Sequence, residues 1–512
     1  MNAAGLLDKL ARQLGEDMER RPWFYVVVVS TVYLEAMAVR AAHTKLWFDE
    51  ILTIYSSRLS MPAMWSFLKE GLELNPPLGH LLVGAAGAVF GRNEIGFRVP
   101  SMLAFWTMCV CLFVFLRRRV PASYAIAGML LPMVTAAAPF AYEARPYGLL
   151  LCFAGIALVA WQAAASGRRR WLALFLIPLS LVSALCSSPM GALLFIPFAV
   201  GEAARTLKRR RIDCPLWLSF AAATPALLIP LQLKAASGAA SSVQNVIGWF
   251  LPATATYVEI LAPALLPLAT ALLIASVVAQ TSRPRKDCED RPGPDSRMPA
   301  HEIWGLLGFV LIPFAAVPLS TLGGPYWPRY SLPAVIGLSG CLILIAACDA
   351  GKKLAGGAVM AGVLFCAFLL QQIANPSQTL PGNRFNTSES VRALIETMAP
   401  HGLPIVVPLS LTFLELEYYS SPTVASDLYY LTDREAAARF AHNVHFDEKG
   451  PVLAKWFPFR AHFEDYRSFI ARHKRFLVAG QDWWLLSKLL EDNAVVTLRA
   501  VAGVRYFDVT VK

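Results

Sequence analysis

Long apolar runs limit what this sequence can fold into more than any other feature. Several of them, such as 122–140 and 257–280, reach the roughly 20 residues that an α-helix needs to cross a bilayer. Only 16% of the 512 residues are charged, whereas a soluble chain carries roughly 25% charged residues. The sequence therefore predicts an all-α polytopic membrane protein.

The basic residues predict which loops face the cytoplasm, because cytoplasmic loops are enriched in Lys and Arg. We place the N-terminus and every basic cluster inside, which gives about eleven membrane-spanning helices. The segment 77–90 is apolar but short for a crossing, so we expect it to lie in or dip into the outer leaflet. The basic clusters are 117–119, 168–170, 208–211, 283–297 and 352–353, and the predicted spans are 23–41, 98–116, 122–140, 146–166, 171–187, 189–204, 215–232, 257–280, 303–320, 331–348 and 355–373.

Three regions follow from this pattern. Residues 1–22 alternate leucines with charges, which is typical of an amphipathic helix on the inner membrane surface. Residues 23–373 form the membrane domain, with a long outer loop at 42–97. Residues 374–512 carry frequent charges and short β-type runs, which predicts a small extracytoplasmic α/β domain. We expect strands at 404–408, 475–478, 494–498 and 506–511 and helices at 435–441 and 483–490.

The net charge of +11 raises the question of a nucleic-acid partner. Its excess of Lys and Arg lies in the membrane half, where it acts as a topology signal, so we predict no nucleic-acid binding. The nine cysteines mostly stand alone inside apolar runs, without a CxxC pair. We interpret them as small core residues rather than as a metal site or a disulfide framework.

Two adjacent carboxylates, Asp49 and Glu50, follow the first apolar run directly. Charges close to hydrocarbon are costly, so this pair is a candidate functional site. The alternative is that both are solvated loop charges at the start of a helix. Neighbours on a helix point about 100° apart. We therefore assign them separate roles: Asp49 as a base, and Glu50 as a residue that orients the loop or contacts an acceptor.

Further charged residues fall on the same predicted face. A lipid-linked sugar phosphate presents its headgroup there, and sugar transfer needs a carboxylate base and fixed cations for the departing phosphate. The oxocarbenium-like transition state also favours a nearby carboxylate. Arginines alone can neutralise one phosphate, so a divalent ion is chemically optional. The candidates are Glu143 as a second carboxylate and Arg145, Arg98, Arg329 and Lys234 as phosphate ligands.

Each of these residues also has a structural alternative. Glu143 and Arg145 can form a local pair at a helix end, and Arg98 and Arg329 can be interfacial anchors. His80, which follows the Pro76-Pro77 pair, can be a polar helix residue rather than a ligand.

Taken in order, these motifs resemble the GT-C glycosyltransferases. The similarity is strongest to the bacterial branch of protein O-mannosyltransferases and lipid A aminoarabinose transferases (glycosyltransferase family 39-like). It covers about the first 350 residues. The motifs are Phe48-Asp49-Glu50, Asn75-Pro76-Pro77-Leu78, Glu94-Ile95-Gly96-Phe97-Arg98-Val99-Pro100-Ser101, Glu143-Ala144-Arg145-Pro146-Tyr147 and Arg329-Tyr330-Ser331-Leu332-Pro333.

The resemblance implies a polyprenyl-phosphate sugar donor and Asp49 as the catalytic base. We expect Asn75, His80, Tyr147 and Tyr330 to contact substrate. The acceptor remains open between an envelope glycan, a lipid and a protein. We expect the protein in the cell (inner) membrane, with transfer on the outer face and inversion of the anomeric centre.

Two other functions are compatible with a polytopic chain. A transporter or lipid flippase should show intramembrane charges and related halves, and Glu35 in the first span is one such charge. A catalytically inactive scaffold that presents its C-terminal domain is the other alternative. The carboxylates and arginines on one predicted face favour the transferase.

Overall fold

The computed structural model describes residues 3–237, 250–281, 298–321, 326–349, 354–374, 391–393, 395–396, 402–442, 444–480, 484–501 and 504–511. The chain divides into two compact units. The first comprises Met1–His43 and Glu73–Ser377 and is a helical bundle. The second comprises Thr44–Leu72 and Gln378–Lys512, so part of the predicted outer loop groups with the C-terminal region.

The bundle confirms the predicted class of polytopic helical membrane protein. Within the described ranges, nine helices are long and apolar enough to cross a membrane. The predicted spans 122–140 and 331–348 correspond to shorter apolar segments, Ala122–Val134 and Ala334–Cys348. The nine are Pro22–His43 (α2), Glu94–Arg117 (α6), Tyr147–Ala165 (α8), Arg170–Ser187 (α9), Pro189–Arg209 (η3 and α10), Cys214–Ala236 (α11, η4 and α12), Phe250–Val278 (within α13), Ala300–Ser320 (α14 and most of α15) and Leu354–Ala374 (α17).

Prolines divide several of these segments. A proline lacks the N–H that the helical ladder needs and clashes with the preceding turn. α7 (Ala122–Leu130) accordingly passes into the 3₁₀ turn η1 (Leu131–Val134) at Pro132, and η4 (Thr224–Leu227) separates α11 from α12. The other boundaries in this unit are η2 (Ala138–Tyr142), η3 (Pro189–Leu194), α10 (Phe195–Arg209), α11 (Cys214–Ala221), α12 (Leu228–Ser237), α13 (Phe250–Thr281), α14 (Ala300–Val310), α15 (Ile312–Thr321), η6 (Pro328–Ser331) and α16 (Ala334–Asp349).

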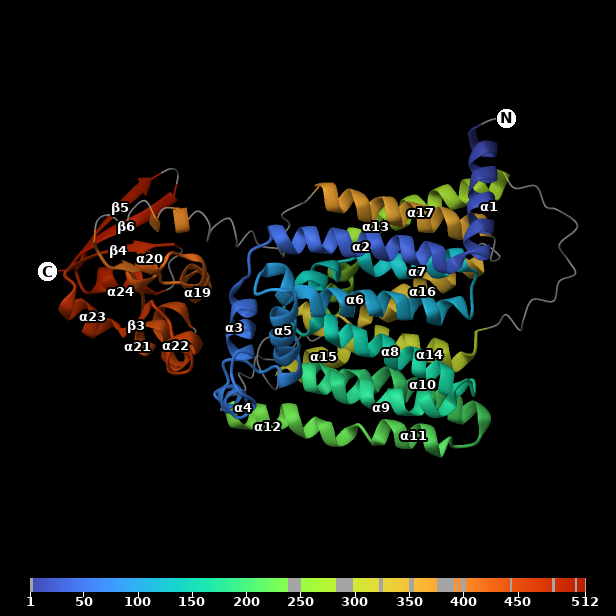
Figure 1. Cartoon of the computed structure of the whole chain (residues 1–512), viewed down its shortest axis with the longest axis horizontal. Coiled ribbons are helices and arrows are strands. Elements are labelled where there is room, and N and C mark those ends of the chain that lie inside the picture. The colour runs from blue at the N-terminus through green and yellow to red at the C-terminus, as the bar shows by residue number, and fades with distance from the viewer. Residues whose placement is uncertain are drawn as a thin grey trace, which may run out of the picture. The chain divides into compact units, whose positions relative to one another are not determined.

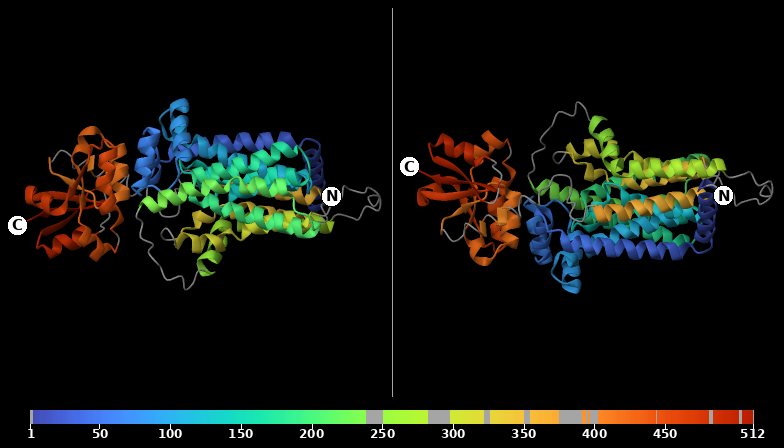
Figure 2. Two further views of the ribbon diagram at one scale, coloured as in Figure 1. Left: turned by 90° about the horizontal axis from the view of Figure 1, so that it is seen from below. Right: turned by 90° about the horizontal axis from the view of Figure 1, so that it is seen from above.

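Two helices lie crosswise to the long helices, at opposite ends of the bundle (Figures 1 and 2). α1 (Ala3–Arg20) packs on α17 at Gly15, where a Cβ would come within 2.7 Å of the Leu354 carbonyl oxygen. Its Glu19 carboxylate accepts the first N–H of α7, from Ala122, at 2.7 Å and also pairs with Arg117. α5 (Pro77–Phe90) is the crosswise helix at the other end. This orientation agrees with a helix that does not cross, although membrane sidedness stays a prediction.

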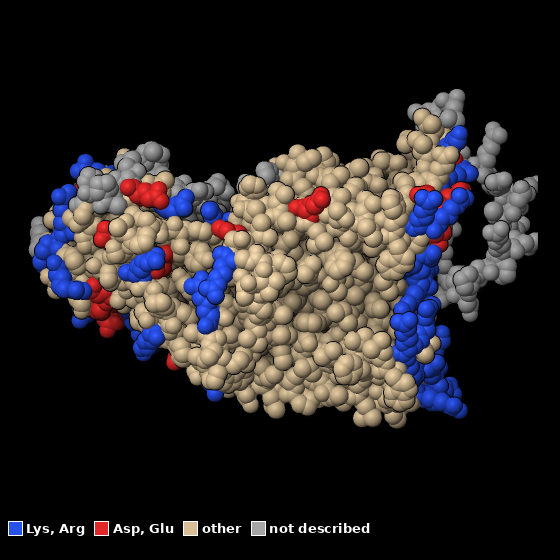
Figure 3. Space-filling view, viewed as in Figure 1, with Lys and Arg blue, Asp and Glu red and all other residues tan. Residues whose placement is uncertain are grey.

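Lys and Arg side chains gather in a band at the α1 end of the bundle, and the side of the bundle seen in Figure 3 is mostly uncharged. The clusters 117–119, 168–170 and 208–211 lie at the ends of the helices on this side. The clusters 283–297 and 352–353 lie outside the described residues. The band is what the bias of Lys and Arg toward one membrane face predicts.

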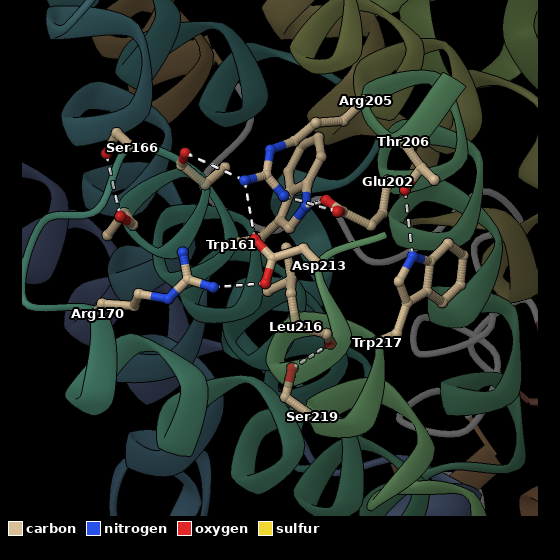
Figure 4. Close-up of polar contacts among 12 residues, drawn as sticks. Trp161, Ser166, Arg170, Glu202, Arg205, Thr206, Asp213, Leu216, Trp217 and Ser219 are labelled. Atoms are coloured by element: carbon tan, nitrogen blue, oxygen red, sulfur yellow. Dashed lines mark hydrogen bonds and ion pairs between the residues drawn. The ribbon is translucent and has the colours of Figure 1, made fainter. Parts of the chain in front are cut away.

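A largely buried ionic network joins the helices at this end of the bundle (Figure 4). Arg205 of α10 binds the Glu202 carboxylate at 2.7 Å and the Asp213 carboxylate at 3.0 Å. Arg170 reaches Asp213 from α9 at 2.5 Å, and the Trp161 indole N–H donates to Glu202 at 3.2 Å. The network therefore connects α8, α9 and α10 with the start of α11.

The second unit is built on one mixed sheet with strand order β3-β2-β1-β4-β6-β5. β1 to β4 pair in parallel, and β6 pairs antiparallel with both β4 and β5. β1, β4, β5 and β6 confirm the four predicted strands, whereas β2 and β3 were not predicted. The bounds are β1 (Ile405–Val406), β2 (Leu428–Thr432), β3 (His462–Asp465), β4 (Arg475–Ala479), β5 (Val495–Val501) and β6 (Val504–Thr510).

Helices cover both faces of this sheet (Figure 2). Alternate strand residues pack into two separate hydrophobic cores, one on each face of the sheet. Ile405 and Leu477 belong to one core, and Val406 and Phe476 belong to the other. Burial on both faces is typical of sheets with parallel strands. The helices of this unit are α3 (Phe48–Ser57), α4 (Met61–Lys69), α19 (Ser410–Tyr419), α20 (Pro422–Ser426), α21 (Arg434–Ala436), the π-helical turn η8 (Ala437–Ala441), α22 (His445–Trp456), α23 (Tyr466–Arg472) and α24 (Leu485–Glu491), of which α3 packs on α19.

The ionic network predicts a stability effect. Arg205→Met should lower the free energy of unfolding by about 3–5 kcal/mol, because it leaves the buried Glu202 carboxylate without its cation. Titration with SDS in mixed micelles measures this change. Arg209→Met, the same substitution at an exposed position of the same helix, is the matched control. Equal midpoints for the two variants would contradict the assigned role.

Candidate active site

The predicted second outer loop carries a buried arginine of the candidate site in the bundle. Arg145 lies between η2 and α8, and its Nη1 contacts the Glu73 carboxylate at 2.5 Å. Both side chains are buried, with 7% and 5% of their surface exposed. The Ser101 hydroxyl donates to the Arg145 carbonyl at 3.1 Å. The loop is therefore fixed from α6 and from the segment that precedes α5.

Glu73 is itself held in place by the motif that follows it. Its Oε1 accepts the Asn75 backbone N–H at 3.0 Å and the Asn75 amide at 2.6 Å. The His80 Nε2 lies 3.3 Å from the Asn75 carbonyl oxygen. Burial alone would raise the pKa of Glu73, but Arg145, His80 and the hydrogen bonds outweigh it and lower that pKa below its ordinary value. Glu73 thus stays an anion that orients Arg145.

A second guanidinium comes close to the same group of side chains. The Arg329 guanidinium, on η6, lies 5.9 Å from the ring centroid of Tyr147, and the Arg145 guanidinium lies 6.0 Å from the same ring. Trp327 adds a further aromatic contact to Arg329 at 5.3 Å. Two cations lie beside one tyrosine ring, and only one of them is paired with the Glu73 carboxylate, so this part of the bundle suits a phosphate.

Arg98 is buried inside the bundle, whereas an interfacial anchor would have an exposed guanidinium. It is 1% exposed, and its Nη1 donates to the Ala41 carbonyl at 2.9 Å, which ties the second turn of α6 to the last turn of α2. Nearby in the chain, Arg40 contacts the Gln371 carbonyl at 2.6 Å and the Tyr142 hydroxyl at 3.5 Å. These two arginines connect α2 with α6, with α17 and with η2.

Asp49 and Glu50 belong to the second unit, in the first turn of α3. Glu50 is fully buried, and its carboxylate accepts the Trp47 N–H at 3.3 Å. Asp49 is half-buried, and its carbonyl accepts the Thr53 hydroxyl at 2.9 Å. The two carboxylates therefore occupy different environments, as their 100° separation predicts.

The bundle thus brings together Glu73, Asn75, His80, Arg145, Tyr147 and Arg329, and Tyr330 is the next residue in the chain. Glu143 is buried, and its carbonyl accepts the Arg145 N–H at 2.7 Å. Lys234 is half-buried near the end of α12. Within the described ranges, no group of three or more His, Cys, Asp and Glu residues could hold a metal ion.

Sequence reasoning did not assign Glu73 and Arg40 to the site. Glu73 is an acid two residues before the Asn75-Pro76-Pro77 motif, and this proximity is the sequence signal that could have identified it as a site residue. Arg40 is a basic residue in the last turn of the first span, on the predicted outer side. A lone charge at that position reads equally well as an interfacial anchor.

Comparison with known proteins gives a result at the level of structure. No family model and no curated protein sequence matches the chain. ArnT from Cupriavidus metallidurans in its apo state aligns over 95% of this chain and 98% of its own length, with a TM-score of 0.53 and 13% identity. The same ArnT bound to undecaprenyl phosphate aligns over 96% and 98%, again with a TM-score of 0.53 and 13% identity.

The chain has the fold of a GT-C membrane glycosyltransferase. This confirms the fold that the sequence motifs implied for about the first 350 residues. The C-terminal α/β region, which the short β-type runs predicted, is confirmed as well. A weaker similarity, with a TM-score of 0.48 and 11% identity, links 94% of this chain to 72% of an oligosaccharyltransferase from Archaeoglobus fulgidus.

The lowered pKa of Glu73 predicts a pH effect. A carboxyl group whose pKa is lower in the folded than in the unfolded protein stabilises the fold at pH values above its ordinary pKa. This contribution is lost as the pH drops through the lowered pKa. Glu73→Gln should therefore flatten the dependence of the thermal midpoint on pH below about pH 4. Glu70→Gln, at an exposed glutamate, should follow the parent. A Glu73→Gln curve parallel to the parent would contradict the ion pair.

Proposed function

We propose that the protein is an integral-membrane glycosyltransferase that uses a polyprenyl-phosphate-linked sugar. It moves the sugar to an acceptor hydroxyl on the outer face of the membrane with inversion. The observation that carries the proposal is the buried Glu73–Arg145 pair, with Arg329 beside the same tyrosine, in a chain with the GT-C fold. The crystal structure of ArnT bound to undecaprenyl phosphate supports a polyprenyl phosphate as the lipid partner.

Arg145 is the first candidate for the donor phosphate. A guanidinium has five N–H donors in a planar fork, so it can bind a carboxylate and a phosphate at once. Glu73 fixes its orientation, and Arg329, Arg98 and Lys234 are the further cations that we assign to the donor. As the glycosidic bond breaks, the leaving phosphate gains charge. A fixed cation therefore stabilises the transition state more than the ground state.

Asp49 is the proposed base. It takes the acceptor hydroxyl proton while the acceptor oxygen bonds to the anomeric carbon, and the bond from that carbon to the phosphate oxygen breaks. The polyprenyl phosphate leaves with the bonding pair, so charge and atoms balance. Glu50 supports this division of roles, since its carboxylate already holds the Trp47 N–H at the start of α3. Glu143 is the second carboxylate, which we propose to stabilise the oxocarbenium-like transition state.

The remaining candidates have supporting roles in this proposal. Asn75 holds Glu73, and through it Arg145, and His80 contacts the Asn75 carbonyl. Tyr147 and Tyr330 flank Arg145 and Arg329 in the chain and contact the donor headgroup.

A transporter or flippase is the competing function. In such a protein an intramembrane charge faces the bundle interior or a water-filled path. Glu35 of α2 instead lies exposed on the outside of the bundle. This observation favours the transferase.

The assignment of the base predicts a loss of turnover. Asp49→Asn should lower kcat by about 10²–10⁴-fold, the range typical of general acid–base groups, and leave the KM for the donor unchanged. Release of polyprenyl phosphate by the purified protein in lipid nanodiscs measures this. Glu70→Gln, another outer-loop acid, serves as the control and should match the parent. Normal turnover by Asp49→Asn would remove this residue as the base.

The assignment of the phosphate ligand requires a double variant. Arg145→Ala alone strands the buried Glu73, so a loss of activity could reflect misfolding. Combining it with Glu73→Gln removes both charges. The double variant should fold and still lose about 10²–10³-fold in kcat/KM for the donor. Arg145→Lys should recover only part of this, because lysine lacks the planar fork.

Arg92→Ala, at an exposed arginine of the same unit, is the control for this series and should match the parent. If the Arg145→Ala/Glu73→Gln variant turns over like the parent, the phosphate is held elsewhere. Arg329 and Lys234 would then be tested next.

A further inference from the structure

The acidic segment packs on the C-terminal domain as one compact unit. Residues Thr44–Leu72 carry α3 and α4, and they cluster with Gln378–Lys512. α3 lies against α19, which follows β1 directly in the chain. The first turn of α3, with Asp49, is thus built on a scaffold that begins more than three hundred residues later in the sequence.

One tyrosine holds the chain just before this turn. The Tyr419 hydroxyl, at the end of α19, accepts the Leu46 backbone N–H at 2.7 Å. The Lys45 ammonium lies 4.8 Å from the centroid of the same ring. Leu46 is buried, with 1% of its surface exposed. Tyr419 therefore fixes the backbone three residues before Asp49.

Aromatic contacts continue this attachment along the whole segment. Phe48 meets Phe446 of α22 edge to face, with ring centroids 5.6 Å apart. Tyr55, at the other end of α3, stacks on Phe457 at 5.3 Å. Phe67 of α4 contacts the same Phe457 at 5.2 Å. Such pairs contribute about 0.5–1.5 kcal/mol each beyond simple burial.

Hydrogen bonds with α19 stabilise the chain that follows Phe457, the residue that Tyr55 and Phe67 contact. Glu417 of α19 accepts the backbone N–H groups of Arg460 and Ala461, each at 3.0 Å. These bonds fix the turn that follows Phe457, the residue on which Tyr55 stacks. α19 therefore supports both ends of α3: Tyr419 holds the chain before its start, and Glu417 holds the turn next to its end. Lys449 adds a hydrogen bond to the Glu70 carbonyl at 2.5 Å, just after α4.

We propose that the C-terminal domain positions Asp49 for catalysis, with Tyr419 as a positioning residue that acts through the Leu46 backbone. The inference rests on the proposed function of Asp49. It gives the C-terminal domain a role in the reaction itself, in contrast to a scaffold that only displays this domain. A catalytic carboxylate must be held to within a fraction of an ångström, since a misplacement of about 1 Å can cost about 10²-fold in rate.

Tyr419→Phe is the direct test. It keeps the ring and its packing but removes the hydroxyl that accepts the Leu46 N–H. In the full-length protein in nanodiscs, kcat should fall about tenfold with the donor KM unchanged. Tyr466→Phe is the matched control. It removes a tyrosine hydroxyl of the same domain that donates to Asp492 at 2.8 Å, on the other face of the sheet. Its kcat should match the parent.

A second readout does not depend on activity. Hydrogen exchange of the amides of residues 46–53 should be about fivefold faster in Tyr419→Phe, because the lost hydrogen bond holds this turn closed. Exchange in Tyr466→Phe should match the parent over the same residues. Unchanged exchange in Tyr419→Phe, or an equal change in both variants, overturns the proposed positioning.

The two measurements separate the inference from the function on which it rests. If the parent protein releases no polyprenyl phosphate, the proposed transferase function fails. If the parent turns over and Tyr419→Phe has the same kcat, the inference fails while the proposed function stands. Faster exchange with a selective fall in kcat supports both.

Discussion

The buried ion pair between Glu73 and Arg145 is the interaction on which the candidate site in the bundle depends. Removing two charges from water costs several kcal/mol per ion, and only close pairing with further hydrogen bonds offsets that cost. Here the second carboxylate oxygen is held by Asn75, and the Arg145 carbonyl is held by Ser101. The pair thereby connects the segment before α5 with the loop before α8, and it places Arg145 beside Tyr147.

The sequence predicted the parts of the structure that local pattern controls. Membrane spans follow from apolar length, and the strands β1 and β4 to β6 follow from short apolar runs between turns. The shorter or more polar strands β2 and β3 lack that signal: His462 and Asp465, at the two ends of β3, are exposed. The arginines and carboxylates of the predicted outer face could be identified as candidate site residues because charges near hydrocarbon are rare.

Long-range partners could not be predicted in the same way. Nothing within the first hundred residues indicates that Leu46 binds the hydroxyl of Tyr419, or that Phe48 meets Phe446. Glu73 is an acid of the predicted outer loop, but its role in orienting Arg145 depends on a contact between residues 72 positions apart in the chain. Side chains that act through tertiary contacts of this kind require the structure.

The most direct measurement of the central claim is photocrosslinking with a diazirine-bearing polyprenyl phosphate, followed by peptide mapping. This probe tests binding of the lipid phosphate itself, whichever sugar and acceptor the protein uses. The account predicts labelling of the peptides that contain Arg145 and Arg329, and competition by unlabelled polyprenyl phosphate but not by phosphatidylglycerol. Labelling that phosphatidylglycerol removes equally well, or that avoids both peptides, would contradict a polyprenyl-phosphate site at this end of the bundle.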